Sequence, residues 1–150
     1  LNKYIDKEHD SLGKYSSKLF TLSNFLRANQ RIIKHQEVKQ SDRDFLLEYW
    51  RSVFDNIEEW AQLEEKSIYK CVLKEEYILT LSVVINAFGR LGYFFYTEKL
   101  DIDLLKELKK IDWLRCNTEW IGRVFNEQGR IIGKEDSIIK ICNLIKKKLG

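Results

Sequence analysis

Hydrophobic residues recur every three or four positions along most of the chain, which is the period of an amphipathic helix. The clearest stripe belongs to a segment whose off-stripe positions are mostly acidic; it consists of Phe45, Tyr49, Trp50, Val53, Phe54, Ile57, Trp60 and Leu63. The pattern predicts helices or short helical turns over residues 16–34, 41–66, 74–96, 104–110, 118–123 and 136–149. The fold class is therefore predicted to be all-α, a single domain of about five or six helices.

Polar residues suited to helix N-termini precede several of these segments. Ser16 and Ser17 come before the first apolar run, and Asp103 and Asn117 come before the two short ones. The sequence SDRD at 41–44 resembles a capping box with Asp in place of Glu. These residues set the predicted starts of the helices.

The third predicted helix is apolar around much of its circumference, as a central helix would be. Gly89 and Gly92 lie inside it, where each costs roughly 1 kcal/mol relative to alanine. We interpret them as sites of close helix–helix approach. Arg90 lies between them in apolar surroundings, so it requires a carboxylate or another anion as its partner.

The stretch RVFNEQGRII predicts a short β-like arm over residues 123–132, turning through Asn126 to Gly129. If Phe125 pairs with Arg130 across this arm, one face of it carries the set Arg123, Phe125, Arg130 and Ile132.

Composition bounds the class of protein. The chain has 150 residues, 44% of them hydrophobic and 33% charged, which indicates a folded domain and excludes a disordered tail. No apolar run reaches the roughly 20 residues of a membrane helix, so we expect a cytoplasmic protein without membrane contact. The absence of methionine, with Leu1 first, indicates a fragment of a longer polypeptide. Residues 1–14 are predicted to be a linker or the end of a preceding segment, and residues 15–150 the helical domain.

Charge is distributed unevenly although the net charge is only +3. Residues 1–36 carry seven Lys or Arg against three Asp or Glu, and residues 106–150 carry eleven against six. Residues 37–66 carry four against nine. Two basic ends thus flank an acidic helix, so the domain either offers a basic face to an anion or pairs its own ends with its middle.

Motifs for catalysis, metals and cofactors are missing. Gly129 to Glu135 imitates a phosphate-binding loop but has three residues between its glycines, not four, and an acidic residue after the lysine. Cys71, Cys116 and Cys142 are far apart, which argues for reduced thiols and against a zinc site. We therefore expect a non-enzymatic chain with no cofactor.

Basic residues near the C-terminus are the candidate anion contacts. Arg115, Arg123 and Arg130 fall within sixteen residues and are followed by Lys134. Arginine matches phosphate in a bidentate way, so these four residues are predicted to bind nucleic acid. The alternative is that neighbouring carboxylates neutralise them within the domain. Trp113 and Trp120 in the same region are either core residues or stacking platforms for bases.

Three segments resemble a known family: SSKLFTLSNFLRANQRII (16–33), LTLSVVINAFGRLG (79–92) and IDWLRCNTEWIGR with the following GRIIGK and IIKICNLIKKKLG (111–150). They are similar to the C-terminal half of the DndB family of DNA sulfur modification proteins, which are DGQHR-domain proteins of bacteria. The matching positions are Arg90, Trp113, Trp120, Gly122, Arg123, Gly129 and Arg130. The family-naming Asp-Gly-Gln-His-Arg motif is absent, as expected for a C-terminal fragment.

The resemblance implies a place in bacterial DNA phosphorothioation, in which sulfur replaces a non-bridging phosphate oxygen. It implies a regulatory, transcription-controlling DNA-binding protein whose partners are DNA and the rest of its own chain. Two departures from the family pattern are Thr118 in place of proline and the acidic pair Glu135 and Asp136. The alternative function is a structural or protein-interaction domain that supports the missing N-terminal part or a homo-oligomer.

Overall fold

A computed structural model describes residues 2–12 and 16–150 of the chain. Most of these residues are helical, which confirms the predicted all-α class. In chain order the elements are η1 (Asn2–Tyr4), β1 (Ile5–Asp6), β2 (Phe20–Thr21), α1 (Leu22–Ile32), α2 (Gln40–Asp55), α3 (Glu58–Glu64), α4 (Lys70–Glu76), α5 (Ser82–Glu98), η2 (Ile102–Lys110), η3 (Thr118–Trp120) and α6 (Glu135–Leu149).

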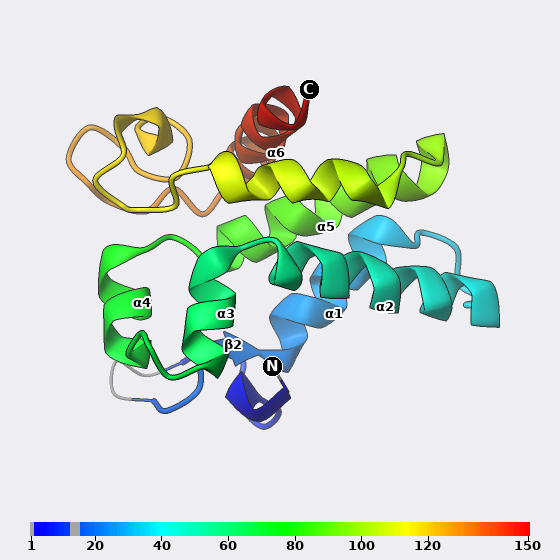
Figure 1. Ribbon diagram of the computed structural model, residues 1–150, viewed down its shortest axis with the longest axis horizontal. Coiled ribbons are helices and arrows are strands. Elements are labelled where there is room, and N and C mark those ends of the chain that lie inside the picture. Colours follow the sequence, from blue (N-terminus) through cyan, green and yellow to red (C-terminus); the bar gives the residue numbers. More distant parts are fainter. Residues whose placement is uncertain (1, 13–15) are drawn as a thin grey trace.

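Helix α5 is the centre of the fold, and its side chains are buried along nearly its whole length. Helix α1 packs along it on one side and α6 on another, and η2 packs against both α6 and α2. Figure 1 shows α2 in front of α1, with the two chain ends at opposite sides of the molecule. Within the described residues, no helix is both long and apolar enough to cross a membrane.

Residues 2–12 are attached to this helical core. Strand β1 pairs in parallel with β2, with Ile5 opposite Phe20 and Asp6 opposite Thr21. The backbone N–H of Leu19 donates to the carbonyl of Tyr4 at 2.8 Å, and the Tyr4 side chain is buried. The predicted domain boundary between residues 14 and 15 lies outside the described residues.

Two tryptophans form a buried pair beneath the arm. Trp113 and Trp120 are 1% and 0% exposed, and their rings stack with centroids 5.7 Å apart. The indole N–H of Trp120 donates to the carbonyl of Asp112 at 3.0 Å. Of the two interpretations given above, the core role is confirmed, because rings without exposed surface cannot stack on bases.

The first helix begins later than predicted. Residues 20 and 21 are extended in β2, and the Thr21 hydroxyl accepts the N–H of Asn24, so α1 begins at Leu22 and not at residue 16. The carbonyls of Ser16 and Ser17 instead accept the ammonium groups of Lys74 and Lys70. Strand pairing and these tertiary contacts override the local capping signal.

Two long predicted helices are each divided in the structure. Residues 41–66 form α2 and α3, because Ile57 is extended and fully buried between them. Residues 74–96 divide into the end of α4 and α5, because Tyr77 is extended and pairs with Leu114. A hydrophobic period continues across such breaks when the residues on both sides face the same core.

Of the predicted N-terminal residues of four helices, two are wrong, one is confirmed and one differs by a single residue. Helix α2 begins at Gln40, with the Asp42 carboxylate accepting the N–H of Lys39, so the predicted box at 41–44 starts too late. The segment predicted over 104–110 is the 3₁₀ helix η2, capped by Asp101 and not by Asp103. Asn117 caps η3 as predicted. Helix α6 starts one residue earlier than predicted.

Glycines allow α1 and α5 to approach closely. A Cβ added at Gly89 would lie 2.7 Å from the carbonyl oxygen and 2.8 Å from the Cα of Ala28. At Gly92 it would lie 2.7 Å from Ile32 and 2.8 Å from Tyr49. The predicted packing role of both glycines is confirmed, and this contact holds the basic residues of α1 beside Arg90 of α5.

Candidate anion-binding site

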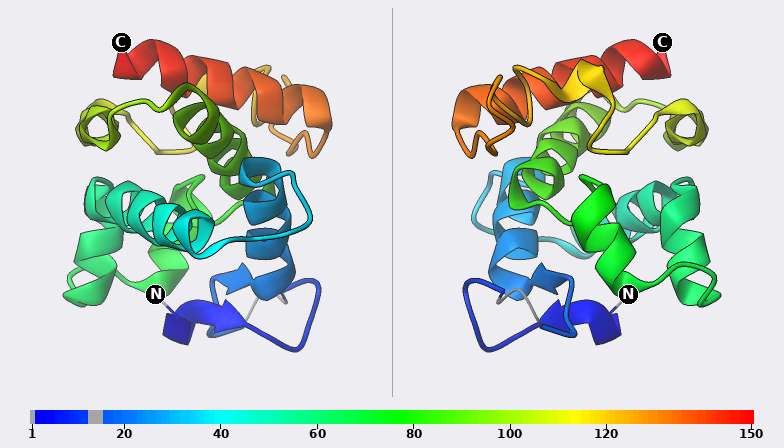
Figure 2. Two further views of the ribbon diagram at one scale, coloured as in Figure 1. Left: turned by 90° about the vertical axis from the view of Figure 1, so that its right-hand side faces the viewer. Right: turned by 90° about the vertical axis from the view of Figure 1, so that its left-hand side faces the viewer.

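A hollow of about 460 Å³ lies where α1, α5 and the start of α6 meet. Figure 2 shows the beginning of α6 above the C-terminal end of α1, with α5 passing between the helices. Positions 27, 30 and 31 lie on one face of α1, Lys34 follows two residues after the end of this helix, and positions 90 and 93 lie on one face of α5. The hollow is lined by Arg27, Gln30, Arg31, Lys34, Arg90, Tyr93 and Glu135. We call it the basic hollow.

Arg31 has an internal partner. Its two terminal nitrogens donate to the two carboxylate oxygens of Glu135 at 2.7 and 2.8 Å. Its Nε donates to the side-chain oxygen of Asn86 at 3.1 Å, which fixes the plane of the guanidinium. The bond to Arg31 lowers the pKa of Glu135, and the field of Arg90 lowers it further. Glu135 is therefore ionised at neutral pH and accepts hydrogen bonds from both terminal nitrogens of Arg31.

Arg90 has no acceptor among the described residues. Its Nε is buried and forms no hydrogen bond, and its guanidinium carbon lies 5.7 Å from the ring centre of Phe94. The requirement for an anionic partner is therefore not met by a short-range contact within this part of the chain. A buried N–H without a partner costs about 1–3 kcal/mol.

Arg27 and Lys34 complete the basic wall. Both are exposed, and the described residues provide neither with a carboxylate. The ammonium of Lys34 lies 4.0 Å from the ring centre of Tyr93, which positions it at the rim through a cation–π contact. The basic hollow thus has four cations and one carboxylate, and only Arg31 is paired with that carboxylate.

Arg115, one of the predicted nucleic-acid contacts, is used in folding. Its Nε and one terminal nitrogen donate to the carbonyls of Tyr77 and Lys74, at 3.0 and 2.6 Å. These bonds satisfy carbonyls at the end of α4, and burial lowers the pKa of the guanidinium. The guanidinium also lies 5.8 Å from the ring centre of Phe125, which ties α4 to the arm.

The arm forms with the predicted turn but another register. The N–H of Gly129 donates to the carbonyl of Asn126, which closes the turn, and Gly129 has a positive φ of 78°. Phe125 pairs with Ile131 and not with Arg130. A shift of one residue moves a side chain to the opposite face, so the predicted common face of Arg123 and Arg130 is wrong.

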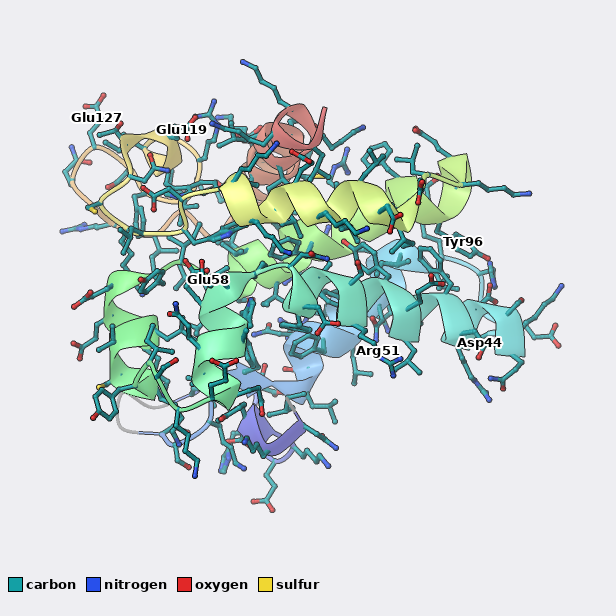
Figure 3. The ribbon with its side chains drawn as sticks, viewed as in Figure 1. Asp44, Arg51, Glu58, Tyr96, Glu119 and Glu127 are labelled. Atoms are coloured by element: carbon teal, nitrogen blue, oxygen red, sulfur yellow. The ribbon has the colours of Figure 1, made fainter. Side chains whose placement is uncertain are left out.

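The remaining predicted cations differ in how they are used. Arg123 donates to the carbonyl of Glu119 at 2.7 Å and lines a second hollow with Lys140 and Lys147. Figure 3 shows Glu119 and Glu127 at the end of the molecule formed by the arm. Arg130 and Lys134 are exposed, and Lys134 precedes α6 directly beside Glu135 of the basic hollow. Their predicted role in binding stays a prediction.

The sequence-based prediction did not include the basic residues of α1 or Lys34, which follows it. A usable signal was present, because Arg27, Arg31 and Lys34 are spaced by four and three residues, opposite the apolar stripe of the helix predicted over residues 16–34. In the structure, Lys34 lies two residues beyond the end of α1. The contribution of Glu135 had no such signal, since it comes from a helix more than a hundred residues later.

A buried carboxylate elsewhere has a structural role. Asp42 is 3% exposed and accepts the Tyr96 hydroxyl at 2.6 Å, the Lys39 N–H at 2.9 Å and the His35 ring at 2.7 Å. The Tyr96 bond, then those of Lys39 and His35, lower its pKa to about 2. A carboxylate with this pKa is a poor general base at neutral pH.

Comparison with known proteins identifies a family. The family model of DndB, described as DNA-sulfur modification-associated, matches residues 1–150. No curated protein and no solved structure matches the chain. The match covers the whole chain and therefore includes the basic hollow and the arm.

Proposed function

The chain belongs to the DndB family of DNA-sulfur modification-associated proteins, and on this basis we propose that it is a regulatory domain that binds the DNA backbone without catalysis. The observation that carries the proposal is the basic hollow, in which Arg27, Lys34 and Arg90 lack a protein acceptor among the described residues. Phosphate oxygens are the acceptors that DNA offers to such side chains.

Electrostatics supports backbone contact over base readout. Guanidinium groups bind phosphate through paired N–H donors, and the site contains two arginines from different helices that have no carboxylate partner among the described residues, the exposed Arg27 and the half-buried Arg90. Lys134 directly precedes Glu135, which lines the hollow, and Arg130 is exposed on the arm. Backbone contacts of this kind position a protein on DNA but carry no sequence information directly.

Salt dependence tests the proposal. If the chain neutralises about three phosphates, its affinity for a duplex falls about fortyfold between about 50 and 200 mM salt. Fluorescence anisotropy of a labelled duplex of about 30 base pairs measures this. Absence of binding at the lower salt concentration would contradict the proposal for this chain.

Three double variants locate the contact surface. Arg27→Ala with Lys34→Ala removes two cations of the basic hollow and is expected to flatten the salt dependence. Arg51→Ala with Lys109→Ala removes the same charge from exposed positions outside the hollow and serves as the control; Figure 3 labels Arg51 on α2. Equal effects of the two variants would show that only the net charge matters. Arg123→Ala with Arg130→Ala tests the arm in the same assay.

One feature favours the alternative of a protein-interaction domain. An apolar hollow of about 670 Å³ lies between α2 and α3, and Leu47 at its side is 61% exposed. Its apolar lining consists of Ile5, Phe25, Leu47, Trp50, Phe54, Trp60, Ala61 and Leu63. This alternative predicts self-association or binding to another part of the full-length protein, with little salt effect. Sedimentation velocity of the wild type and of Leu47→Glu measures self-association.

A further inference from the structure

The contact between Arg31 and Glu135 has the geometry of an anion complex. Two parallel N–H donors of one guanidinium meet two oxygens of one acidic group, at 2.7 and 2.8 Å. A phosphate presents its oxygens to arginine in the same way. Glu135 is more than half exposed, so its carboxylate can leave Arg31 without unfolding α6. The carboxylate therefore occupies a position that an incoming phosphate would take.

We propose that the basic hollow is a site for one phosphate monoester, the terminal phosphate of a nucleotide or of a DNA strand, and that this phosphate displaces Glu135 from Arg31. The inference rests on the proposed function, since it assigns a specific group to the same basic surface. It goes further, because general backbone contact needs neither a terminal phosphate nor the release of Glu135.

Charge favours a monoester over an internal phosphodiester. Arg27, Arg31, Lys34 and Arg90 carry four positive charges against the single negative charge of Glu135. An internal phosphodiester brings one negative charge, whereas a monoester brings about 1.5 to 2 at neutral pH. The monoester therefore neutralises more of the excess charge around the hollow.

Shape favours the same ligand. The hollow is bounded by three helices, and Arg90 lies half-buried in its wall, with its Nε shielded from solvent. A terminal phosphate is joined to its sugar on one side only, so it can enter such a recess with three oxygens available. An internal phosphodiester continues as chain on both sides. A volume of about 460 Å³ accommodates a phosphate together with part of its sugar.

The first test uses residues 1–150 and compares two kinds of DNA strand end. Two duplexes of identical sequence, labelled internally, carry either 5′-phosphates or 5′-hydroxyls. We expect about tenfold tighter binding of the phosphorylated duplex, the effect of at least one added charged hydrogen bond. Added deoxyadenosine 5′-monophosphate should weaken binding of the phosphorylated duplex to the level of the hydroxyl duplex, and deoxyadenosine should have no such effect. Preference for the phosphorylated end identifies DNA as the source, whereas nucleotide binding without that preference identifies a free nucleotide; both support the site.

Two pairs of variants test the residues. Glu135→Gln removes the competing carboxylate and should tighten binding of deoxyadenosine 5′-monophosphate about fivefold, the Coulombic effect of one charge at about 4 Å in water-like surroundings. Asp136→Asn is the matched control, since Asp136 is adjacent in α6 but pairs with Lys140 outside the hollow. Arg90→Met should abolish the preference for phosphorylated ends, whereas Arg51→Met should preserve it. Circular dichroism confirms that each variant is folded.

The outcomes separate this inference from the proposed function. Steep salt-dependent binding of both duplexes, with no effect of the terminal phosphate and no nucleotide binding, overturns the inference and leaves DNA contact intact. Nucleotide binding by a chain that does not bind duplexes supports the site and contradicts the DNA-binding function. Equal effects of Glu135→Gln and Asp136→Asn overturn the displacement of Glu135.

Discussion

Substitution of Gly89 by alanine tests the contact that brings Arg90 of α5 close to the basic residues of α1. A Cβ at this position would lie 2.7 Å from the carbonyl oxygen of Ala28, 2.8 Å from its Cα and 3.0 Å from its Cβ. Favourable contacts between such atoms need about 3.5 Å or more, so α1 and α5 would have to separate by several tenths of an ångström. Two of the three opposing atoms are backbone, and therefore no side-chain rotation relieves the clash.

Two opposing effects determine how much Gly89→Ala changes the free energy of unfolding. Alanine in place of glycine inside a helix gains about 1 kcal/mol from backbone propensity. Overpacking a close contact costs about 1–3 kcal/mol, and the upper part of that range applies where the backbone must move. The expected net result is a loss of about 1–2 kcal/mol in the free energy of unfolding. For a chain of this size, that loss lowers the melting temperature by roughly 3–8 °C.

Urea unfolding followed by circular dichroism measures this loss as a lower midpoint. Gly133→Ala is the matched control, because nothing lies within 4 Å of its Cβ position and its φ is not left-handed. We expect the control to be neutral or stabilised by up to about 1 kcal/mol. A Gly89→Ala variant as stable as the wild type would show that propensity outweighs the contact and that the helices are not held at this distance by glycine.

Three further predictions concern the arm, the cap of α2 and the basic hollow. Arg115→Lys should lower the free energy of unfolding by about 2 kcal/mol, measured in urea, because one ammonium group cannot replace two guanidinium bonds to separate carbonyls. The pKa of Asp42 is lowered to about 2, so its contribution to stability is complete above its ordinary pKa near 4 and is lost as the pH falls toward 2. Tyr96→Phe removes the largest cause of this shift, so the fall of the urea midpoint between about pH 4 and pH 2 should be smaller in the variant than in the wild type. Arg90→Met should leave stability unchanged or raise it by about 1 kcal/mol in thermal melts, because it removes a buried N–H without a partner; a clear loss of stability would show that this nitrogen has an acceptor in solution.

Local rules predicted the parts of the fold in which one segment decides its own structure. The last helix was predicted to within one residue, because its apolar stripe and the acidic residues of its first turn act together. The turn from Asn126 to Gly129 follows from a glycine that adopts a positive φ. The helix–helix role of Gly89 and Gly92 follows because their cost inside an apolar helix has to be offset by packing.

Long-range pairing explains most of the errors. Tyr77 carries a helical pattern, yet it is extended because Leu114 pairs with it and the N–H of Ile78 donates to the carbonyl of Trp113. The start of α1 is displaced because residues 20 and 21 pair with β1. Arg115 donates to the carbonyls of Lys74 and Tyr77 at the end of α4, a contact that the sequence did not indicate, whereas its predicted role in nucleic-acid binding stays a prediction. In each case the partner is more than ten residues away, so no local window contains it.

The basic hollow depends both on a local feature of the sequence and on long-range contacts. The sequence shows that Arg90 needs an acidic partner, since a charge in an apolar helix is costly. The carboxylate nearest to the hollow, Glu135, binds Arg31 and not Arg90. Folding therefore brings four cations together and neutralises one of them directly. A cluster that repels itself and leaves a buried N–H unsatisfied lowers stability, and such costs are concentrated at binding sites, where a ligand removes them. The unpaired Arg90, more than the total charge, is what distinguishes this hollow from an ordinary basic surface.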